Sequence, residues 1–220
     1  MIRFFETLHY EKTDRLLDYG CGFGRFYPFF GSRTDYYGID ISQSMIDECV
    51  RRFPENAGKF TVGEGEELPF ADNSFDKIIC FGVFDACYQE SALSQMLRVC
   101  KEGGTILITG KNTRYHTNDE QAYIAEEAAR GKGHPNYFTD VSDMEAQLKP
   151  YVTFKQRRYY AYRGDFANDR YTEVMPERFY EWALVLEKKQ HVDVTFEKFA
   201  DAYSDTWKAK TNEASMCDLG

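Results

Sequence analysis

The sequence predicts an α/β fold: a doubly wound, mostly parallel sheet in a single domain. Between Arg15 and Lys111, short β-rich runs alternate with stretches of helical spacing, and the turns that join them are short. This alternation is typical of a parallel sheet covered by helices on both faces. The chain has 220 residues, of which 43% are hydrophobic and 29% charged, a composition typical of a globular domain with a buried core.

Five strands and three helices are expected in this first half. The clearest strand is Phe75–Phe81, which is apolar on both faces, as a buried parallel strand is. Ser42 is expected to cap the second helix. The expected strands are Arg15–Asp18, Asp35–Ile39, Lys59–Val62, Phe75–Phe81 and Thr105–Thr109, and the expected helices lie near Arg25–Phe30, Ser42–Arg52 and Ser91–Cys100.

After Lys111 the alternation changes, and a helical insertion is expected. Asn118–Arg130 has helical character, with Thr117 or Asn118 as its cap and Gly131 as its end. This helix would lie between the fifth strand and the next helix of the sheet, where an inserted lid would lie.

The remaining chain is expected to complete a seven-stranded sheet. Ser142–Leu148 reads as a helix in which Ser142 and Glu145 form a capping box. Two alternating runs, Lys155–Tyr162 and Tyr180–Leu186, predict an antiparallel pair of strands, and Thr195–Lys208 predicts a final amphipathic helix.

Charge and cysteine usage exclude several classes of function. The net charge of −9 disfavours non-specific binding to nucleic acid or to anionic membranes. No run of 18 apolar residues occurs, and Met1–Lys12 does not resemble a secretory signal. The cysteines form no C-x-x-C pair, so we expect no metal site, no disulfide framework and a cytoplasmic location with reduced thiols. The six cysteines are Cys21, Cys49, Cys80, Cys87, Cys100 and Cys217.

The strongest motif is the glycine-rich turn after the first strand, Leu16–Arg25 (LLDYGCGFGR). Glycines at such a turn let the backbone lie against a ligand, and the following helix points its N-terminus at that ligand. The spacing is G-x-G-x-G and not the dinucleotide pattern G-x-G-x-x-G. Asp18 stands before the first glycine, where a carboxylate suits an ammonium group better than a pyrophosphate. A generic strand–helix turn remains the alternative.

A second acidic residue, Asp40, ends the second expected strand. In doubly wound folds an acid near this place binds the hydroxyl groups of a ribose. The alternative is that Asp40 caps the following helix.

Four blocks in this order carry a resemblance to a known family. They are LLDYGCGFGRF at Leu16–Phe26, YYGIDISQSMI at Tyr36–Ile46, GEGEELPFADNSFDKIICFGVF at Gly63–Phe84 and MLRVCKEGGTILIT at Met96–Thr109. With these blocks, covering about half of it, the chain resembles the class I S-adenosylmethionine-dependent methyltransferases, in particular their small-molecule branch. The resemblance implies a Rossmann-like fold and one methyltransferase domain over residues 1–220. Its parts would be a cofactor-binding part (1–111), a lid and substrate-side part (112–182) and a last strand end with a C-terminal helix and tail (183–220).

The resemblance also implies residue roles for S-adenosylmethionine, whose product is S-adenosylhomocysteine. The glycine turn would frame the amino-acid end of the cofactor, Asp40 would bind the ribose, and Glu64 would lie near the adenine amino group. The implied cofactor-binding residues are Asp18, Gly20, Cys21, Gly22, Asp40, Ile41, Met45, Glu64, Gly65, Cys80 and Phe81.

One departure from the family leaves the catalytic group open. Many relatives carry a His shortly after the fourth strand, and here Asp85 occupies that place. A base is needed only where the acceptor is a hydroxyl of high pKa, and the candidates are Asp85 and His116. The candidate acceptor contacts are Phe84, Tyr88, Tyr115 and His116.

The resemblance implies methyl transfer to a small-molecule acceptor, and we expect an oxygen atom to receive the methyl group. The alternatives are an N-methyltransferase of a small metabolite and a non-catalytic S-adenosylmethionine-binding protein. A nicotinamide oxidoreductase is disfavoured by the glycine spacing. The sequence leaves the oligomeric state open between monomer and dimer.

Overall fold

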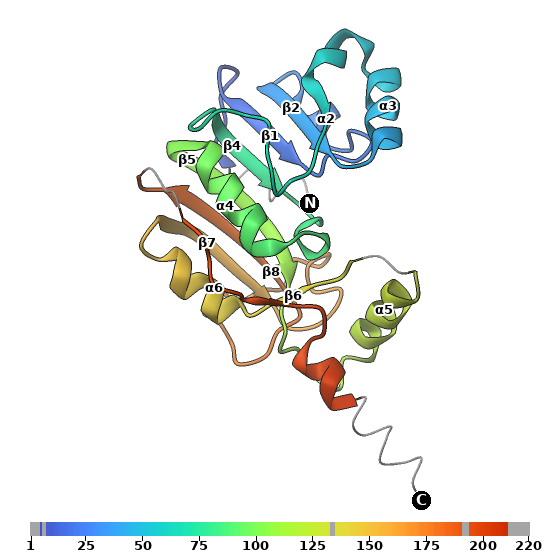
Figure 1. Cartoon of the computed structure of the whole chain (residues 1–220). Helices are drawn as coiled ribbons and strands as arrows, with labels where there is room; N and C mark the ends of the chain where they lie inside the picture. The colour runs from blue at the N-terminus through green and yellow to red at the C-terminus, as the bar shows by residue number, and fades with distance from the viewer. Residues whose placement is uncertain (1–4, 6–7, 133–134, 191–193, 211–220) are drawn as a thin grey trace, which may run out of the picture.

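The computed structural model describes residues 5, 8–132, 135–190 and 194–210. Its centre is one seven-stranded sheet with the strand order β3-β2-β1-β4-β5-β8-β7 (Figure 1). The first five strands in this order are parallel, and β8 runs antiparallel to both of its neighbours. The predicted fold class is confirmed. The strands are β1 (Arg15–Tyr19), β2 (Asp35–Asp40), β3 (Phe60–Val62), β4 (Phe75–Cys80), β5 (Cys100–Lys111), β7 (Val152–Tyr160) and β8 (Glu181–Lys188).

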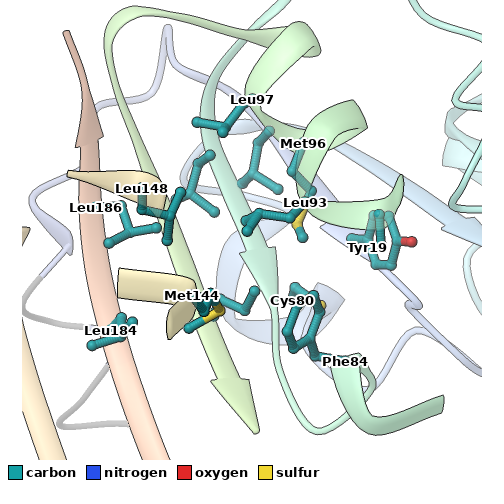
Figure 2. Close-up of a cluster of buried hydrophobic side chains, with 14 of the residues drawn as sticks. Tyr19, Cys80, Phe84, Leu93, Met96, Leu97, Met144, Leu148, Leu184 and Leu186 are labelled. Atoms are coloured by element: carbon teal, nitrogen blue, oxygen red, sulfur yellow. The ribbon is translucent and has the colours of Figure 1, made fainter. Parts of the chain in front are cut away.

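Helices cover both faces of the sheet and bury two hydrophobic cores. On one face, α2 (Tyr27–Phe30) and α3 (Gln43–Arg52) pack against apolar side chains of β1, β2 and β4. On the other face lie α4 (Gln89–Val99) and α6 (Val141–Leu148). Figure 2 shows Leu93 and Met96 of α4 facing β4, and Met144 of α6 near Leu184 of β8. Each fully buried leucine of this kind stabilises the fold by about 1.5–3 kcal/mol, so the sheet is a rigid support for the loops at its edge.

A helical segment lies between β5 and β7, as expected for an insertion. It contains α5 (Glu120–Gly131), which stands apart from the two helix layers in Figure 1. A separate two-stranded sheet joins β6 (Phe138–Thr139) to β9 (Ala200–Asp201). Two short 3-10 helices, η2 (Pro54–Lys59) and η3 (Phe84–Ala86), precede β3 and α4. In the described ranges, we find no helix with the length and apolar character needed to cross a membrane.

The expected C-terminal helix Thr195–Lys208 is wrong over most of its length. Only residues 205–210 of that region are helical, and the part before them is extended. The backbone N–H groups of Phe199 and Ala200 donate to Oε1 of Glu90 on α4, at 2.7 and 2.8 Å. The apolar residues of this stretch therefore serve two different contacts: Phe199 joins the core of the sheet, and Trp207 stacks on Tyr123 of α5 at 5.0 Å.

The caps of α5 and α6 also differ from the prediction. Asp119, and not Thr117 or Asn118, accepts the hydrogen bond from the backbone N–H three residues on, at 3.0 Å. At α6 the cap is Asp140, which accepts in the same way at 3.1 Å, so that Ser142 falls inside the helix. A carboxylate is a stronger hydrogen-bond acceptor than the uncharged side chains expected at these caps. Asp119 and Asp140 therefore cap the two helices, one or two residues away from the expected cap positions.

Glu145, the other half of the expected capping box, has a different role. Its carboxylate accepts hydrogen bonds from Arg157 and Tyr159 of β7. It therefore joins α6 to the sheet instead of closing the N-terminus of its own helix.

Candidate active site

The glycine-rich turn after β1 has a backbone that only glycine adopts readily. Gly20, Gly22 and Gly24 have φ of 73°, 53° and 74°, in the left-handed region. A Cβ atom on Gly20 would lie 2.5 Å from Cγ1 of Val83, so the turn after β4 is packed directly on this backbone. No atom lies within 4 Å of the corresponding position on Gly22. The turn thus leaves open space beside Gly22, where a ligand can approach the backbone.

A cavity of about 330 Å³ opens at the carboxyl ends of β1, β2 and β3. It brings together five of the residues that the sequence implied for the cofactor, together with Tyr88 from the acceptor candidates. The backbone of Gly65 borders the cavity and packs on Tyr19. A Cβ atom on Gly65 would lie 1.7 Å from the hydroxyl of Tyr19, so a side chain does not fit there. The five cofactor candidates are Gly20, Asp40, Ile41, Glu64 and Gly65.

Asp40 holds the glycine turn and borders the cavity at the same time. Its carboxylate accepts hydrogen bonds from the backbone N–H groups of Gly22 at 2.8 Å and Ser42 at 2.9 Å. A carboxylate has about four acceptor sites, so two remain for a ligand. Support of the local backbone and ligand binding therefore coexist. Ser42 is the N-cap residue of α3, as expected, but its side chain makes no capping hydrogen bond, and its hydroxyl contacts that of Ser44 at 3.0 Å.

Asp18 lies beneath the turn and not in the cavity. Its side chain is buried and accepts a hydrogen bond from the hydroxyl of Tyr36. Burial raises the pKa of Asp18 to about 7; the bond from Tyr36 opposes this rise, and the charge of Asp40 adds to it. Cys21 is buried nearby, and its Sγ lies 2.8 Å from where a Cβ atom on Gly38 would be. The turn is thus supported from below by two groups whose pKa values burial raises.

Four other expected cofactor residues do not border this cavity, among them Gly22 in the turn itself. Met45 is 41% exposed on α3, and Cys80 is fully buried in the core. The ring of Phe81 packs edge-on against Phe5 and Phe26, with ring centroids 5.4 and 5.5 Å apart.

A smaller cavity of about 100 Å³ lies at the same edge of the sheet, where β4 and β5 end and β8 begins. The turn after β4 forms one side of it: Gly82 has φ of 70°, and its N–H donates to Oγ1 of Thr109 at 2.9 Å. Aromatic rings and ionisable groups share its lining. The residues that border it are Phe81, Gly82, Asp85, Thr109, Gly110, Lys111, Phe166, Glu181 and Trp182.

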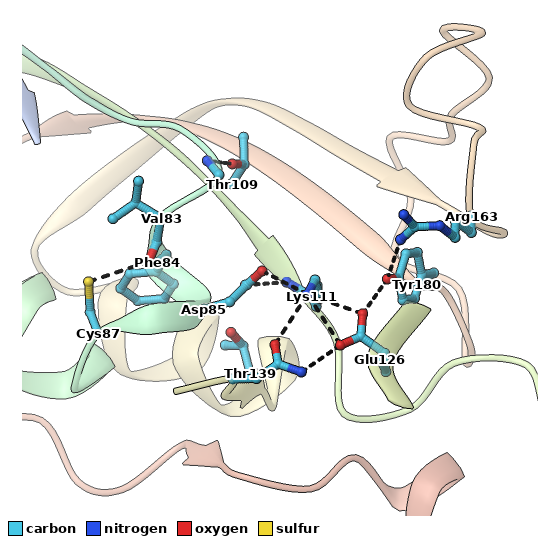
Figure 3. A network of polar contacts seen from close by, with 12 residues as sticks. Val83, Phe84, Asp85, Cys87, Thr109, Lys111, Glu126, Thr139, Arg163 and Tyr180 are labelled. Carbon is cyan, nitrogen blue, oxygen red and sulfur yellow. Dashed lines mark hydrogen bonds and ion pairs between the residues drawn. The ribbon is translucent and has the colours of Figure 1, made fainter. Parts of the chain in front are cut away.

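A buried network of charges stands beside the smaller cavity (Figure 3). Nζ of Lys111 lies 3.4 Å from the carboxylate of Asp85 and 3.1 Å from that of Glu126 on α5. Burial raises the pKa of Asp85 to about 6 against the opposing effect of Lys111. Burial alone would lower the pKa of Lys111, but the two carboxylates raise it. Asn136 and Tyr180 also bind Glu126, so the network joins α5 to the sheet edge.

Sequence reasoning missed Glu181, which also borders the smaller cavity. Burial raises its pKa to about 7, with Arg163 opposing the rise. The residue pairs with Lys111 across the β5–β8 ladder, so it reaches the carboxyl edge of the sheet although it lies 70 positions later in the chain. The only signal in the sequence was its place at the start of an expected strand.

The structure separates the four expected acceptor contacts. Tyr88 borders the larger cavity and is 67% exposed. Phe84 is fully buried against Trp182. Tyr115 is fully buried among side chains around α5, and His116 stacks on Tyr162 at 4.6 Å; neither of these two borders either cavity.

The segment after α5 does approach the larger cavity, through Pro135 and Tyr137. The backbone N–H of Tyr137 donates to the carbonyl oxygen of Asp85 at 2.7 Å. Gly133 and His134, which follow the expected lid helix, lie outside the described residues. Metal-binding clusters of three or more His, Cys, Asp or Glu side chains are absent from the part of the chain that the structure describes.

Comparison with known proteins finds similarity over the part of the chain that contains the glycine turn. Residues 17–108 match the model of a methyltransferase domain. The chain is 38% identical over 96 residues to the demethylmenaquinone methyltransferase of Renibacterium salmoninarum, covering 43% of this chain and 40% of that protein. It is 36% identical over 107 residues to the ubiquinone/menaquinone biosynthesis C-methyltransferase UbiE of Azotobacter vinelandii, covering 44% and 42%. The chain thus spans less than half the length of the curated relatives that it matches.

Solved structures extend the likeness to the fold of nearly the whole chain. YcgJ from Bacillus subtilis superposes with a TM-score of 0.62 at 18% identity, covering 86% of this chain and 97% of that one. A TehB-like SAM-dependent methyltransferase from Corynebacterium glutamicum superposes with a TM-score of 0.58 at 19% identity, covering 85% and 86%. At these identities the likeness concerns the fold alone.

Proposed function

Because residues 17–108 match the model of a methyltransferase domain, we propose that the chain is a class I S-adenosylmethionine-dependent methyltransferase that transfers a methyl group from this cofactor to a small-molecule acceptor. The observation that carries the proposal is the larger cavity. Its volume of about 330 Å³ lies within the roughly 300–1,000 Å³ typical of sites for small ligands. It opens at the carboxyl ends of parallel strands, where ligands bind in this class of fold.

The residues present fit the cofactor. Asp40 has free acceptor positions for the two ribose hydroxyl groups, and Ile41 is 70% exposed beside it, where an adenine ring can cover it. Glu64 and Gly65 border the same end of the cavity. The open space beside Gly22 suits the amino-acid end, with Asp18 below the turn as a carboxyl group that can ionise toward an ammonium group. When bound, the cofactor supplies an activated methyl group on a sulfonium.

The chain's own contribution is alignment and exclusion of water. Methyl transfer is an in-line displacement, and holding the two reactants in register supplies much of the acceleration. We place the reacting group of the acceptor in the smaller cavity. The turn after β4 borders this cavity and also packs on the glycine turn, which would face the cofactor, so the two sites are neighbours. Pro135 and Tyr137 cover part of the larger cavity and limit the entry of water there.

Two observations bear on which atom receives the methyl group: the name of a relative and the side chains that line the smaller cavity. One of the two relatives described above is named as a C-methyltransferase, which favours carbon over the oxygen expected from the sequence. The carboxylates beside the smaller cavity suit an acceptor that reacts after losing a hydroxyl proton. We therefore propose a hydroxylated, conjugated acceptor that is methylated at carbon. The domain division into a cofactor part (1–111) and a substrate part (112–182) belongs to the same proposal.

The direct test is a transfer assay with purified protein. S-adenosylmethionine is supplied with hydroquinones, phenols and primary amines in separate reactions, and S-adenosylhomocysteine is measured by chromatography. We expect product with a hydroxylated aromatic acceptor and none with amines. Proton NMR of the product then distinguishes a methyl group on carbon from one on oxygen. Turnover of amines alone would contradict the proposed acceptor class, and cofactor binding without any turnover would contradict the enzyme.

Asp40 provides the matching test of the cofactor site. Asp40→Ala removes a hydrogen-bonded carboxylate, which contributes on the order of 1.5–3 kcal/mol, so affinity for S-adenosylmethionine should fall roughly ten- to a hundredfold. Calorimetry measures the change. Asp35→Ala is the matched control, because Asp35 lies at the other end of β2 and pairs with Lys59 at 2.6 Å. Equal affinity of both variants would remove the ribose assignment.

A further inference from the structure

We propose that Glu181 is the general base of the reaction and takes the hydroxyl proton from an acceptor in the smaller cavity. The inference rests on the methyl transfer proposed above and adds a catalytic residue to it. It also states the acceptor class more closely: a planar ring with a hydroxyl group at the reacting end.

The direction of β8 brings Glu181 to the right edge of the sheet. Because β8 is antiparallel to β5, its first residues meet the last residues of β5, with Glu181 opposite Lys111 and Trp182 opposite Gly110. Residues at the carboxyl ends of β4 and β5 therefore share one cavity with the beginning of β8. This is the edge at which the glycine turn faces the cofactor.

The cavity has walls that suit a ring with a polar end. Phe81 and Phe166 border it, with ring centroids 5.6 Å apart. Gly82 adds no side chain, and no atom lies within 4 Å of where its Cβ atom would be, which leaves room for a planar group. At Gly110 that position lies 2.5 Å from the ring of Trp182, which fills the space itself. Trp182 also borders the cavity, is fully buried, and has an indole N–H without a hydrogen-bond partner among the described residues.

Glu181 is the carboxylate at this cavity that is free to act. Asp85 accepts from the backbone N–H of Lys111 at 3.1 Å and is also held by its ammonium group. For the carboxylate of Glu181, we find no hydrogen bond or ion pair with any residue in the described ranges. A base must have an oxygen available for the incoming proton, and Glu181 meets that condition.

Four charged groups face Glu181 from the surrounding elements and set its proton affinity. Arg163 and Lys111 favour its ionised form, whereas Asp85 and Glu126 disfavour it. Burial is the largest effect, and the balance places the pKa of Glu181 at about 7. A base with a pKa close to the working pH is efficient, because it is substantially ionised and still binds a proton strongly.

The step balances as follows. The hydroxyl proton of the acceptor passes to a carboxylate oxygen of Glu181, and the electron pair of the O–H bond remains on the acceptor. An electron pair of the acceptor, on the ring carbon or on oxygen, forms the new bond to the methyl carbon. The S–CH₃ bond breaks with its pair going to sulfur, which becomes a neutral thioether. For a ring carbon, loss of its hydrogen as a proton to water restores aromaticity, and Glu181 returns its proton to the acceptor oxygen. For an acceptor oxygen, Glu181 passes its proton to water, so in both cases one proton is released per turnover and Glu181 is ionised again.

The experiment compares Glu181→Gln with Glu187→Gln. Glu187 lies on the same strand at the opposite edge of the sheet, where it pairs with Lys155 at 3.2 Å. With an acceptor from the transfer assay, Glu181→Gln should lower kcat by about 10²–10⁴-fold and leave the affinity for S-adenosylmethionine unchanged. Glu187→Gln should match the wild type. In the wild type, log kcat should rise with pH up to about 7 and then level off.

A binding measurement tests the same carboxylate without turnover. Phenol is titrated by calorimetry into the protein with S-adenosylhomocysteine, at pH 6 and at pH 8. If the carboxylate accepts the phenol hydroxyl, binding by the wild type should tighten about tenfold between these pH values, which is the change in the ionised fraction of a group with a pKa of about 7. The affinity of Glu181→Gln for phenol should change less than twofold between pH 6 and pH 8. Glu181→Asp retains a carboxylate and should regain the pH dependence. Glu181→Ala, which lacks a carboxylate, replaces Glu181→Gln if that variant does not fold.

The outcomes separate the two proposals. A wild type that transfers no methyl group to any acceptor overturns the proposed function and Glu181 with it. An active wild type whose Glu181→Gln variant keeps both its kcat and the pH dependence of phenol binding overturns the role of Glu181 alone. Loss of both in Glu181→Gln, with Glu187→Gln unaffected, supports Glu181 as the base.

Discussion

At the scale of single residues, two neighbouring carboxylates at the glycine turn have different environments and different uses. Asp40 borders the cavity and accepts two backbone N–H groups, whereas Asp18 is buried below the turn and bound by Tyr36. The fold therefore keeps one carboxylate available to a ligand and buries the other, at a cost in stability when it ionises.

That cost predicts a pH dependence of stability. In the unfolded chain Asp18 ionises near its ordinary pKa of 3.8, whereas in the folded protein it holds its proton up to about pH 7. Unfolding between these values releases a proton, so the free energy of unfolding falls as pH rises through this window, by about 1.4 kcal/mol per unit for this group. Asp85 and Glu181, whose pKa values are also raised, act in the same direction.

Asp18→Asn should remove the contribution of Asp18 to the pH dependence of the free energy of unfolding. Urea unfolding at intervals from pH 4.5 to 7.5, without cofactor, should give a shallower decline than in the wild type and a variant that gains stability relative to the wild type as pH rises. An identical decline in both proteins would mean that Asp18 is already ionised in the folded state.

Sequence reasoning found the residues whose place follows from local chain geometry. Gly20, Asp40 and Glu64 each lie at the carboxyl end of a parallel strand or within two residues of it, so their meeting at one cavity can be predicted from the strand pattern alone. Glu181 could not be found in this way. Its approach to the site depends on the antiparallel direction and the register of β8, which are tertiary properties.

At the scale of elements, the strands were predicted well and the late helices less well. Each expected strand is present, and β5 is longer than expected because it begins at Cys100, ahead of the Gly103–Gly104 pair expected to precede it. The helical pattern of Thr195–Lys208 failed for a different reason. Its apolar residues serve two separate surfaces, and periodicity cannot distinguish one helix face from two unrelated contacts.

The anchoring of α5 gives a prediction at this scale. The side chain of Glu126 is 1% exposed and binds Lys111, Asn136 and Tyr180. Removing one partner of a buried ion pair costs roughly 3–5 kcal/mol, and Asp85 still pairs with Lys111, so Glu126→Ala should cost about 3 kcal/mol.

We expect that loss to be local. Hydrogen exchange of the α5 amides should accelerate, whereas exchange in β1 and β4 and affinity for S-adenosylmethionine should stay close to the wild type, because Glu126 does not border the larger cavity. Glu127→Ala, on the exposed side of the same helix, is the control. Uniform acceleration across the sheet would show that α5 is part of the global folding unit.

At the scale of the whole molecule, ligand binding should be visible as added stability. A ligand present at about 100 times its Kd stabilises the folded state by about 2.7 kcal/mol. For a chain of this size, each kcal/mol shifts Tm by roughly 2–4 °C, so S-adenosylmethionine or S-adenosylhomocysteine should raise Tm by about 5–11 °C. NAD should leave Tm unchanged. A rise with NAD and none with S-adenosylhomocysteine would contradict the cofactor assignment.

The antiparallel entry of β8 also has a consequence for how such proteins diverge. The family match ends at residue 108, and the part of the smaller cavity that would handle the acceptor is built largely from later positions, among them Phe166, Glu181 and Trp182. Substitutions there can exchange one acceptor for another while the inherited cofactor module stays intact. A duplicated gene can thus acquire a new substrate without first losing its methyl donor, and the two halves of the chain are free to evolve at different rates.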